Sequence, residues 1–217
     1  LSLLEAETPD VVGIGNALRD IVSGNQRIDD VLRRLRGLLR KERRDYAAVD
    51  VNTIVNDVLK LVHSDFIERR IAIDVALGPD LPAVLGDRIQ LQQVVLNILM
   101  NAAEAVSAAP AADDRHITVT TAAAGPEVTV SVADRGVGVS DAEFDQLFNP
   151  FFTTKRDGMG LGLSICRTII TAHGGHISAR RNHDRGLTCW FALDRAPAPS
   201  LVPAHAGSAA DAQRLNA

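Results

Sequence analysis

The first 45 residues carry the most regular hydrophobic pattern of the chain. Apolar residues recur in steps of three and four from Val11 to Leu39, the spacing of one helical face sustained over about four heptads. Asn25 is polar and lies in this seam, and a single polar seam position commonly fixes register and oligomeric state. The pattern predicts a long helix of a dimerisation hairpin; the alternative is a surface helix packed within one domain.

The chain begins at Leu1 rather than Met, and Thr8-Pro9-Asp10 interrupts the helical pattern. The residues before this break have the composition of the end of another helix. We therefore expect a piece of a longer protein, in which most of the first hairpin helix precedes Leu1.

Helical and strand patterns alternate between residues 46 and 195. Helices are predicted over 52–64, 87–108, 141–147 and 161–172, and strands over 70–77, 117–121, 128–133, 176–180 and 187–193. The central strands are joined by a turn at Gly125-Pro126 and are predicted to form a hairpin. Hairpins favour an α+β fold, a two-layer α/β sandwich, over a doubly wound parallel sheet.

Three regions follow from these patterns. Residues 1–45 are predicted to be a partial dimerisation hairpin, and residues 46–195 a domain of mixed helices and strands. Residues 196–217 are rich in Ala and Pro and have no periodicity, which predicts a disordered tail.

Composition narrows the class of protein. The 217 residues include 27 acidic and 23 basic side chains, for a net charge of -4, which argues against a nucleic-acid binder. Two cysteines cannot build a disulfide framework, and no apolar run approaches the roughly 20 residues of a membrane span. We expect a cytoplasmic location without direct membrane contact, leaving open whether the parent protein is anchored.

Polar residues form a stripe along the predicted helix 87–108. Asn97 and Asn101 lie four residues apart and Glu104 three further on, so helical geometry stacks them on one face. A single Asn on a helix is usually just solvated, but two of them beside a carboxylate on an otherwise apolar helix are less easily dismissed. Amide oxygens are hard ligands that suit Mg²⁺, which also shares phosphate oxygens.

Two glycine-rich segments add candidate chemistry. Asp134 ends a predicted strand and precedes Gly136 and Gly138, which lets a flat ligand approach the backbone; the alternative is a plain Asp-Gly turn. Gly158, Gly160 and Gly162 open a predicted helix, where free backbone N–H groups bind anions. Neither the Rossmann fingerprint nor a P-loop ending is present.

These segments, in this order, resemble the ATP-binding catalytic domain of two-component sensor histidine kinases, over roughly residues 51–193. Asn97 and Asn101 match the asparagine box of that family, Asp134 to Gly138 its first glycine box, Phe148 to Phe152 its phenylalanine box, and Gly158 to Gly162 its second glycine box. The run from Phe152 through Lys155 into the last box is most similar to the nitrogen-regulation and oxygen-sensing branch.

The resemblance implies a Bergerat-type fold that binds ATP and Mg²⁺. It implies that Asp134 recognises the adenine amino group, that Asn101 ligates the metal with Asn97 near the phosphates, and that Lys155 neutralises phosphate charge. It assigns Asn97, Asn101 and Lys155 to catalysis. The nucleotide-binding set is completed by Gly136, Gly138, Gly158, Gly160, Leu161 and Gly162.

The family transfers the γ-phosphoryl group of ATP to a His, for relay to an Asp of a response-regulator receiver domain. None of the histidines at 63, 116, 173, 176, 183 and 205 has the sequence context of such an acceptor, so we expect the acceptor on the missing hairpin helix. One alternative is an ATPase of the same fold, but those enzymes activate water with a Glu at the position of Asn97, and an amide is no general base. The other is a non-catalytic dimeric nucleotide-binding scaffold.

The seam predicts a homodimer through residues 11–42. Replacing its polar residue, Asn25→Leu, is expected to raise stability and to broaden the distribution of oligomers, because the residue that specifies the register is lost. Sedimentation of the unmodified chain and of the variant measures both effects. A monomer at micromolar concentration would show that residues 11–42 do not suffice for dimerisation.

Overall fold

The computed structural model describes residues 46–109, 114–155 and 158–197. The chain divides into two units, Leu1–Arg44 and Asp45–Ala217, and every element described here belongs to the second. The predicted helix over 11–42 and the predicted tail after residue 197 lie outside the described residues.

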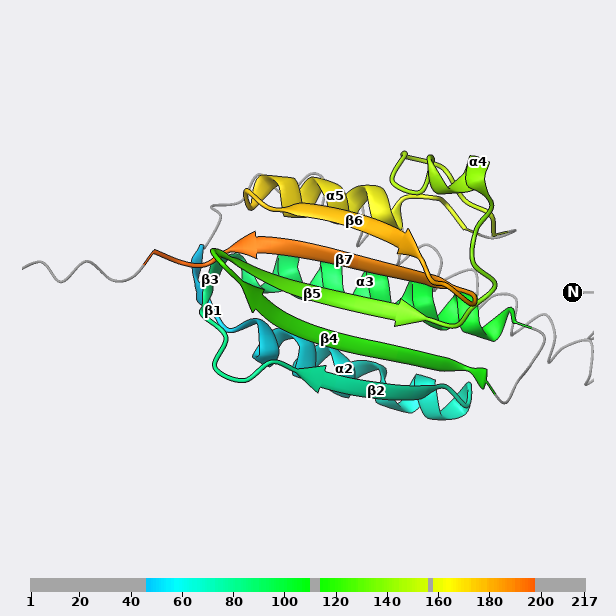
Figure 1. Ribbon diagram of the computed structural model, residues 1–217, viewed down its shortest axis with the longest axis horizontal. Helices are drawn as coiled ribbons and strands as arrows, with labels where there is room; N and C mark the ends of the chain where they lie inside the picture. The colour runs from blue at the N-terminus through cyan, green and yellow to red at the C-terminus, as the bar shows by residue number, and fades with distance from the viewer. Residues whose placement is uncertain (1–45, 110–113, 156–157, 198–217) are drawn as a thin grey trace, which may run out of the picture. The chain divides into compact units, whose positions relative to one another are not determined.

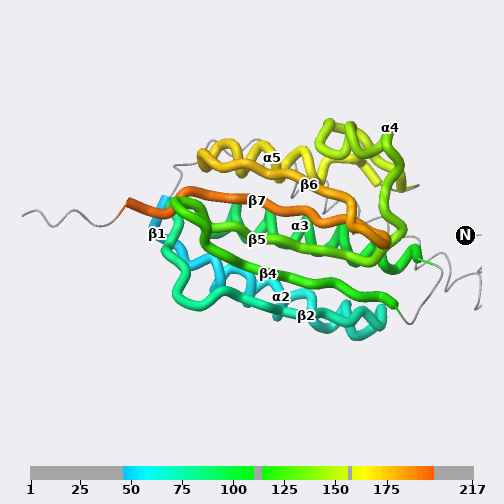
Figure 2. The backbone as a smooth tube through the Cα atoms, viewed as in Figure 1, coloured from blue at the N-terminus to red at the C-terminus, as the bar shows by residue number. Residues whose placement is uncertain are grey.

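A five-stranded sheet forms one layer of the domain (Figures 1 and 2). Its strands, in spatial order, are β2 (Ala72–Leu77), β4 (His116–Ala124), β5 (Glu127–Asp134), β7 (Leu187–Asp194) and β6 (His176–Arg181). β2 runs parallel to β4, and the other pairs are antiparallel, including the predicted β4–β5 hairpin. The sheet is therefore mixed, with one parallel strand at its edge.

Three helices form the second layer and cover one face of the sheet (Figure 1). They are α2 (Val51–Glu68), α3 (Arg88–Ser107) and α5 (Gly162–Ala172). The predicted two-layer α/β sandwich is confirmed. Within the three described ranges, no helix combines the length and the apolar character needed to cross a membrane.

Some elements differ from the sequence prediction. A two-stranded sheet of β1 (Ala47–Val49) and β3 (Val84–Gly86) was not predicted, because three residues are too few to reveal alternation. The short helix α4 covers only Asp141–Phe144, where Ser140 and Glu143 form a capping box, and turns replace its predicted end.

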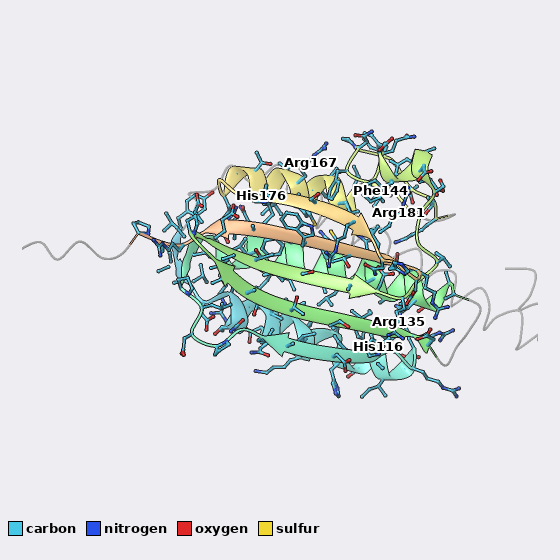
Figure 3. All side chains as sticks on the ribbon, in the orientation of Figure 1. His116, Arg135, Phe144, Arg167, His176 and Arg181 are labelled. Atoms are coloured by element: carbon cyan, nitrogen blue, oxygen red, sulfur yellow. The ribbon has the colours of Figure 1, made fainter. Side chains whose placement is uncertain are left out.

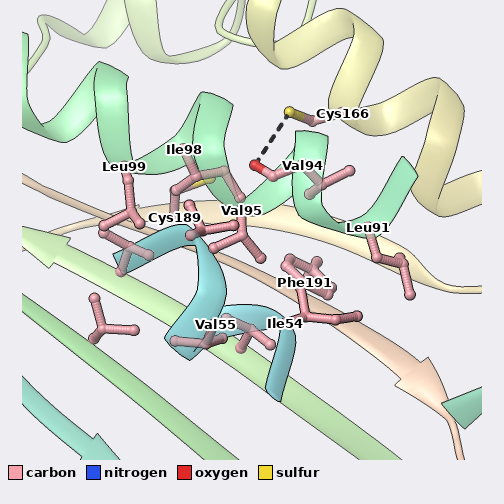
Figure 4. Close-up of a cluster of buried hydrophobic side chains, with 14 of the residues drawn as sticks. Ile54, Val55, Leu91, Val94, Val95, Ile98, Leu99, Cys166, Cys189 and Phe191 are labelled. Atoms are coloured by element: carbon pink, nitrogen blue, oxygen red, sulfur yellow. Dashed lines mark hydrogen bonds between the residues drawn. The ribbon is translucent and has the colours of Figure 1, made fainter. Parts of the chain in front are cut away.

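The core lies between the helices and the sheet (Figure 4). Along β5 the valines 128, 130 and 132 are buried at alternate positions, as period two requires, and face the helices. α3 contributes eight buried residues, from Leu91 to Val106. Both cysteines are buried, as expected for core thiols; burial raises the pKa of Cys189.

His173 ties the end of α5 to the start of α3. Its Nε2 accepts the Asp87 backbone N–H at 3.0 Å, and its Nδ1 lies 2.8 Å from the Ile169 carbonyl oxygen, to which it donates. Asp87 caps α3 by accepting the backbone N–H groups of Ile89 and Gln90. The start of the helix that carries the asparagine stripe is therefore fixed by two independent contacts.

Burial predicts which apolar residues of α2 stabilise the domain. Ile54 is 1% exposed and Ile67 is 64% exposed on the same helix. Ile54→Ala is expected to lower the free energy of unfolding by about 2–5 kcal/mol because it leaves a cavity. Ile67→Ala, the matched control, is expected to change it by less than about 1 kcal/mol. Equal losses in denaturant titrations of the two variants would contradict this core.

Candidate functional site

The polar stripe of α3 lies along the margin of its buried face. Asn97 and Asn101 are half-buried, whereas Glu104 is exposed. The Asn97 Nδ2 atom is fully buried and has no hydrogen-bond partner among the described residues. An unpaired buried donor is costly, and a ligand oxygen would satisfy it.

Asp134 extends the buried register of β5 with a carboxylate in place of an apolar side chain. It is 7% exposed. Its Oδ1 atom accepts the backbone N–H of Gly136 at 2.8 Å and that of Leu187 at 3.3 Å. Burial raises the pKa of Asp134, and these two hydrogen bonds act in the opposite direction. Oδ2 accepts no hydrogen bond in the described part of the chain and is the oxygen left for a ligand.

Glycine is required where the segment after Asp134 meets α3. A Cβ on Gly136 would lie 2.5 Å from the carbonyl carbon of Ala105, and the Val137 N–H donates to the Ala105 oxygen at 3.2 Å. Ala105 is one turn beyond Asn101, so the first glycine segment lies next to the asparagine stripe. Gly138 has φ of +69° and lies near Gly186.

The second glycine segment packs on the phenylalanine segment and ends beside the same stripe. Gly160 has φ of +65°, and a Cβ there would lie 2.4 Å from the backbone of Phe151 and Phe152. A Cβ on Gly162 would lie 3.6 Å from Nδ2 of Asn101. α5 thus begins at the asparagine stripe.

The start of α5 offers free backbone donors. Leu161 is its N-cap, is half-buried and makes no side-chain cap. Uncapped N–H groups at a helix N-terminus suit an anion. Gly158, two residues before Gly160, lies against Thr153, so a Cβ would be 2.4 Å from the Thr153 hydroxyl.

Lys155 reaches back to α3. Its Nζ donates to the Asn101 Oδ1 atom at 3.1 Å and forms an ion pair with Glu104. The amide oxygen of Asn101 therefore faces a position that a cation occupies, which fits the expected role in binding Mg²⁺. The described residues contain no cluster of three His, Cys, Asp or Glu side chains suited to a metal. Mg²⁺ commonly binds through one or two protein oxygens together with phosphate oxygens, and Asn101 could supply one of the protein oxygens.

Sequence reasoning missed the residues that hold Asp134 from β7 and the turn before it. Gly186 has φ of +84°, and a Cβ there would lie 2.1 Å from the Asp134 carbonyl oxygen. Asn182 Nδ2 donates to that same oxygen at 2.8 Å. The one signal in the sequence was Gly186, which directly precedes a predicted strand. The sequence alone does not show that this glycine lies against Asp134.

A hollow of about 320 Å³ is lined by Asp134, His116, Arg135 and residues 182–185. Figure 3 shows His116 and Arg135 at the same end of the sheet. Asp114 contacts the guanidinium groups of Arg135 and Arg185, and the Arg135 hydrogen bond in particular lowers the pKa of Asp114. These contacts connect the two segments that flank the Asp134 carboxylate.

Comparison with known proteins identifies the family of this domain. Residues 86–197 match the family model described as histidine kinase-, DNA gyrase B- and HSP90-like ATPase. The chain is 34% identical over 178 residues to the C4-dicarboxylate transport sensor protein DctS of Rhodobacter capsulatus, covering 82% of this chain and 27% of that protein. It is 34% identical over 195 residues to the sensor protein FixL of Bradyrhizobium diazoefficiens, covering 89% and 38%.

Solved structures show the same likeness. The catalytic domain of histidine kinase ThkA superposes with a TM-score of 0.61 at 30% identity, covering 70% of this chain and 96% of that one. Full-length ShkA in complex with AMPPNP superposes with a TM-score of 0.69 at 30% identity, covering 91% and 42%.

The chain belongs to the histidine kinase-, DNA gyrase B- and HSP90-like ATPase family. Within it, the domain is of the sensor histidine kinase type, which confirms the resemblance found in the sequence. The chain spans 27% of the length of DctS and 38% of the length of FixL.

Replacing Asp134 is expected to affect the stability of the domain and its affinity for adenine nucleotide in opposite directions. The pKa of Asp134 is higher in the folded than in the unfolded state. The folded domain therefore loses stability as the pH rises from the unfolded-state pKa through the folded-state pKa, because the buried carboxyl group must ionise. Asp134→Asn is therefore expected to leave stability at pH 7 equal or higher, while adenine-nucleotide affinity falls by about 1–3 kcal/mol through a spoiled hydrogen bond.

Thermal melts and calorimetry with ADP measure the two quantities. Asp184→Asn, at a side chain that is 96% exposed, is the control and is expected to change neither. Unchanged ADP affinity in Asp134→Asn would remove Asp134 from the site.

Proposed function

We propose that this chain is the ATP-binding catalytic core of a sensor histidine kinase and transfers the γ-phosphoryl group of ATP to a histidine. The observation that carries the proposal is the convergence on one end of α3 of Asn101, Lys155 and both glycine segments. This set supplies a metal-facing amide, a cation and backbone donors for a triphosphate. Phosphoryl transfer depends mainly on such positioning and charge neutralisation.

Each group has a distinct task in this proposal. Asp134 Oδ2 accepts a hydrogen bond from the exocyclic amine of adenine. The N–H groups at the start of α5 and that of Gly160 bind phosphate oxygens, and Gly158 lets the loop pass close to Thr153. The unpaired Asn97 amide donates to phosphate, and Lys155 offsets its charge. Mg²⁺, held through Asn101, would neutralise the triphosphate when bound.

The acceptor histidine is proposed to come from a dimerisation helix rather than from the described domain. His173 has both ring nitrogens engaged by backbone groups. His176 and His116 lie beside Glu127 and Asp74 on sheet strands. The proposed assembly is a homodimer through residues 11–42, and the proposed partner is the receiver domain of a response regulator.

Hydrolysis of ATP by water is the weaker candidate. Asn97 takes the place of a catalytic Glu and cannot remove a proton. Glu104, the carboxylate nearest to Asn101 on the stripe, is engaged by the Lys155 ammonium.

The proposal predicts that the chain binds ATP but does not phosphorylate itself. In-line transfer needs an imidazole about 3 Å from the γ-phosphorus, and no hydrogen bond or ion pair joins a described histidine to Asn97, Asn101 or Lys155. With radiolabelled Mg-ATP, we expect negligible acid-labile phosphate on the chain and slow release of inorganic phosphate.

Adding a separate helical hairpin that bears an acceptor histidine is expected to give acid-labile phosphate on that hairpin. An acceptor His→Ala hairpin is the control. Fast phosphate release without an acceptor would favour an ATPase, and nucleotide binding with no transfer to any supplied hairpin would favour a scaffold.

A further inference from the structure

The Asn101 amide oxygen already has a cation bound to it, and that cation belongs to the protein. Lys155 Nζ donates to Asn101 Oδ1 at 3.1 Å and pairs with Glu104. Lys155 lies 54 residues from Asn101 and 51 from Glu104 along the chain. The contact therefore joins the loop before α5 to the polar stripe of α3.

Glu104 adds an ion pair to the hydrogen bond between Lys155 and Asn101. An amide oxygen alone holds an ammonium weakly in water, whereas a carboxylate one turn further along the same helix face adds charge attraction. The side chains of Lys155 and Glu104 are 42% and 43% exposed, so the pair is weak enough to open.

One oxygen cannot hold both cations in this way. A Mg²⁺ ion on Asn101 would sit roughly 2.1 Å from that oxygen, close enough to the present ammonium position for strong repulsion between the two charges. An incoming triphosphate, by contrast, offers Lys155 new oxygens on the side where α5 begins. Nucleotide and metal together would thus move the lysine without leaving it unpaired.

We propose that Glu104 is a positioning residue that stores the Lys155 ammonium on Asn101, so that binding of the metal–nucleotide exchanges one cation for another at this oxygen. This inference rests on the proposed nucleotide site and adds to it. Glu104 determines how strongly Lys155 competes with Mg²⁺ for the Asn101 oxygen. Before nucleotide binds, Glu104 holds the Lys155 ammonium at Asn101, and after nucleotide leaves it favours the return of the ammonium to that position.

The proposed exchange predicts that substitutions of Glu104 and of Lys155 change the affinity for metal-free ADP in opposite directions. Calorimetry with ADP in the presence of a chelator is performed on the full 217-residue chain. Glu104→Gln releases Lys155 and is expected to tighten metal-free ADP binding by about two- to fivefold, the equivalent of one exposed ion pair. Lys155→Met removes a cation that binds phosphate and is expected to weaken metal-free ADP binding by about the same factor.

Metal dependence gives the second readout. In Lys155→Met the competing cation is gone, so the Mg²⁺ concentration that half-saturates the ADP complex is expected to fall by about two- to fivefold. A lysine that only binds phosphate alongside Mg²⁺ would leave that concentration unchanged or raise it. Glu68→Gln and Lys60→Met, on α2, are the matched charge controls and are expected to match the unmodified chain.

The outcomes separate the two claims. If the unmodified chain binds no ADP with or without Mg²⁺, the nucleotide site itself is wrong, and the exchange with it. If ADP binds but Glu104→Gln leaves metal-free binding unchanged or weakens it, or Lys155→Met leaves the Mg²⁺ requirement unchanged or raises it, the site stands and the exchange is overturned. Circular dichroism melts of each variant confirm that the comparison is between folded proteins.

Discussion

The arrangement of this domain depends on the burial of one carboxylate. Asp134 continues a strand whose preceding inward positions are valines, and it is almost completely removed from water. A buried charge is tolerated only when hydrogen bonds satisfy it, so two backbone N–H groups, from Gly136 and Leu187, converge on one of its oxygens. That demand draws the loop after β5 and the start of β7 together.

The approach of these segments in turn fixes where glycine is needed. At Gly136 the chain passes so close to α3 that any side chain would collide with Ala105, and at Gly186 it would collide with Asp134 itself. The Asp134 carboxylate and the asparagine stripe are thereby held at a set distance by backbone contacts. At the proposed phosphate end the contact is instead made by two flexible side chains, Lys155 and Glu104, which are both partly exposed.

The sequence alone was sufficient to predict the parts of the candidate site that depend on residues close together in the chain. Asn97 and Asn101 share a helix face because of helical periodicity. The apolar period that follows the glycines predicted a helix close to where α5 begins, at Gly162. The β4–β5 hairpin was also predictable from its turn. The contacts of Asn182 and Gly186 with Asp134 were not, because they depend on the β5–β7 register, which pairs residues more than 50 positions apart.

In the proposed function, the metal and the phosphates of the nucleotide meet at Asn101, between α3 and the start of α5. Mn²⁺ in place of Mg²⁺, added with ADP to isotope-labelled chain, broadens nuclear resonances near the bound ion. We predict that broadening centres on Asn101 and includes Asn97, Gly160 and Gly162, and that it requires ADP. Broadening centred instead on His116, Arg135 and Arg185, at the hollow beside Asp134, would contradict the account.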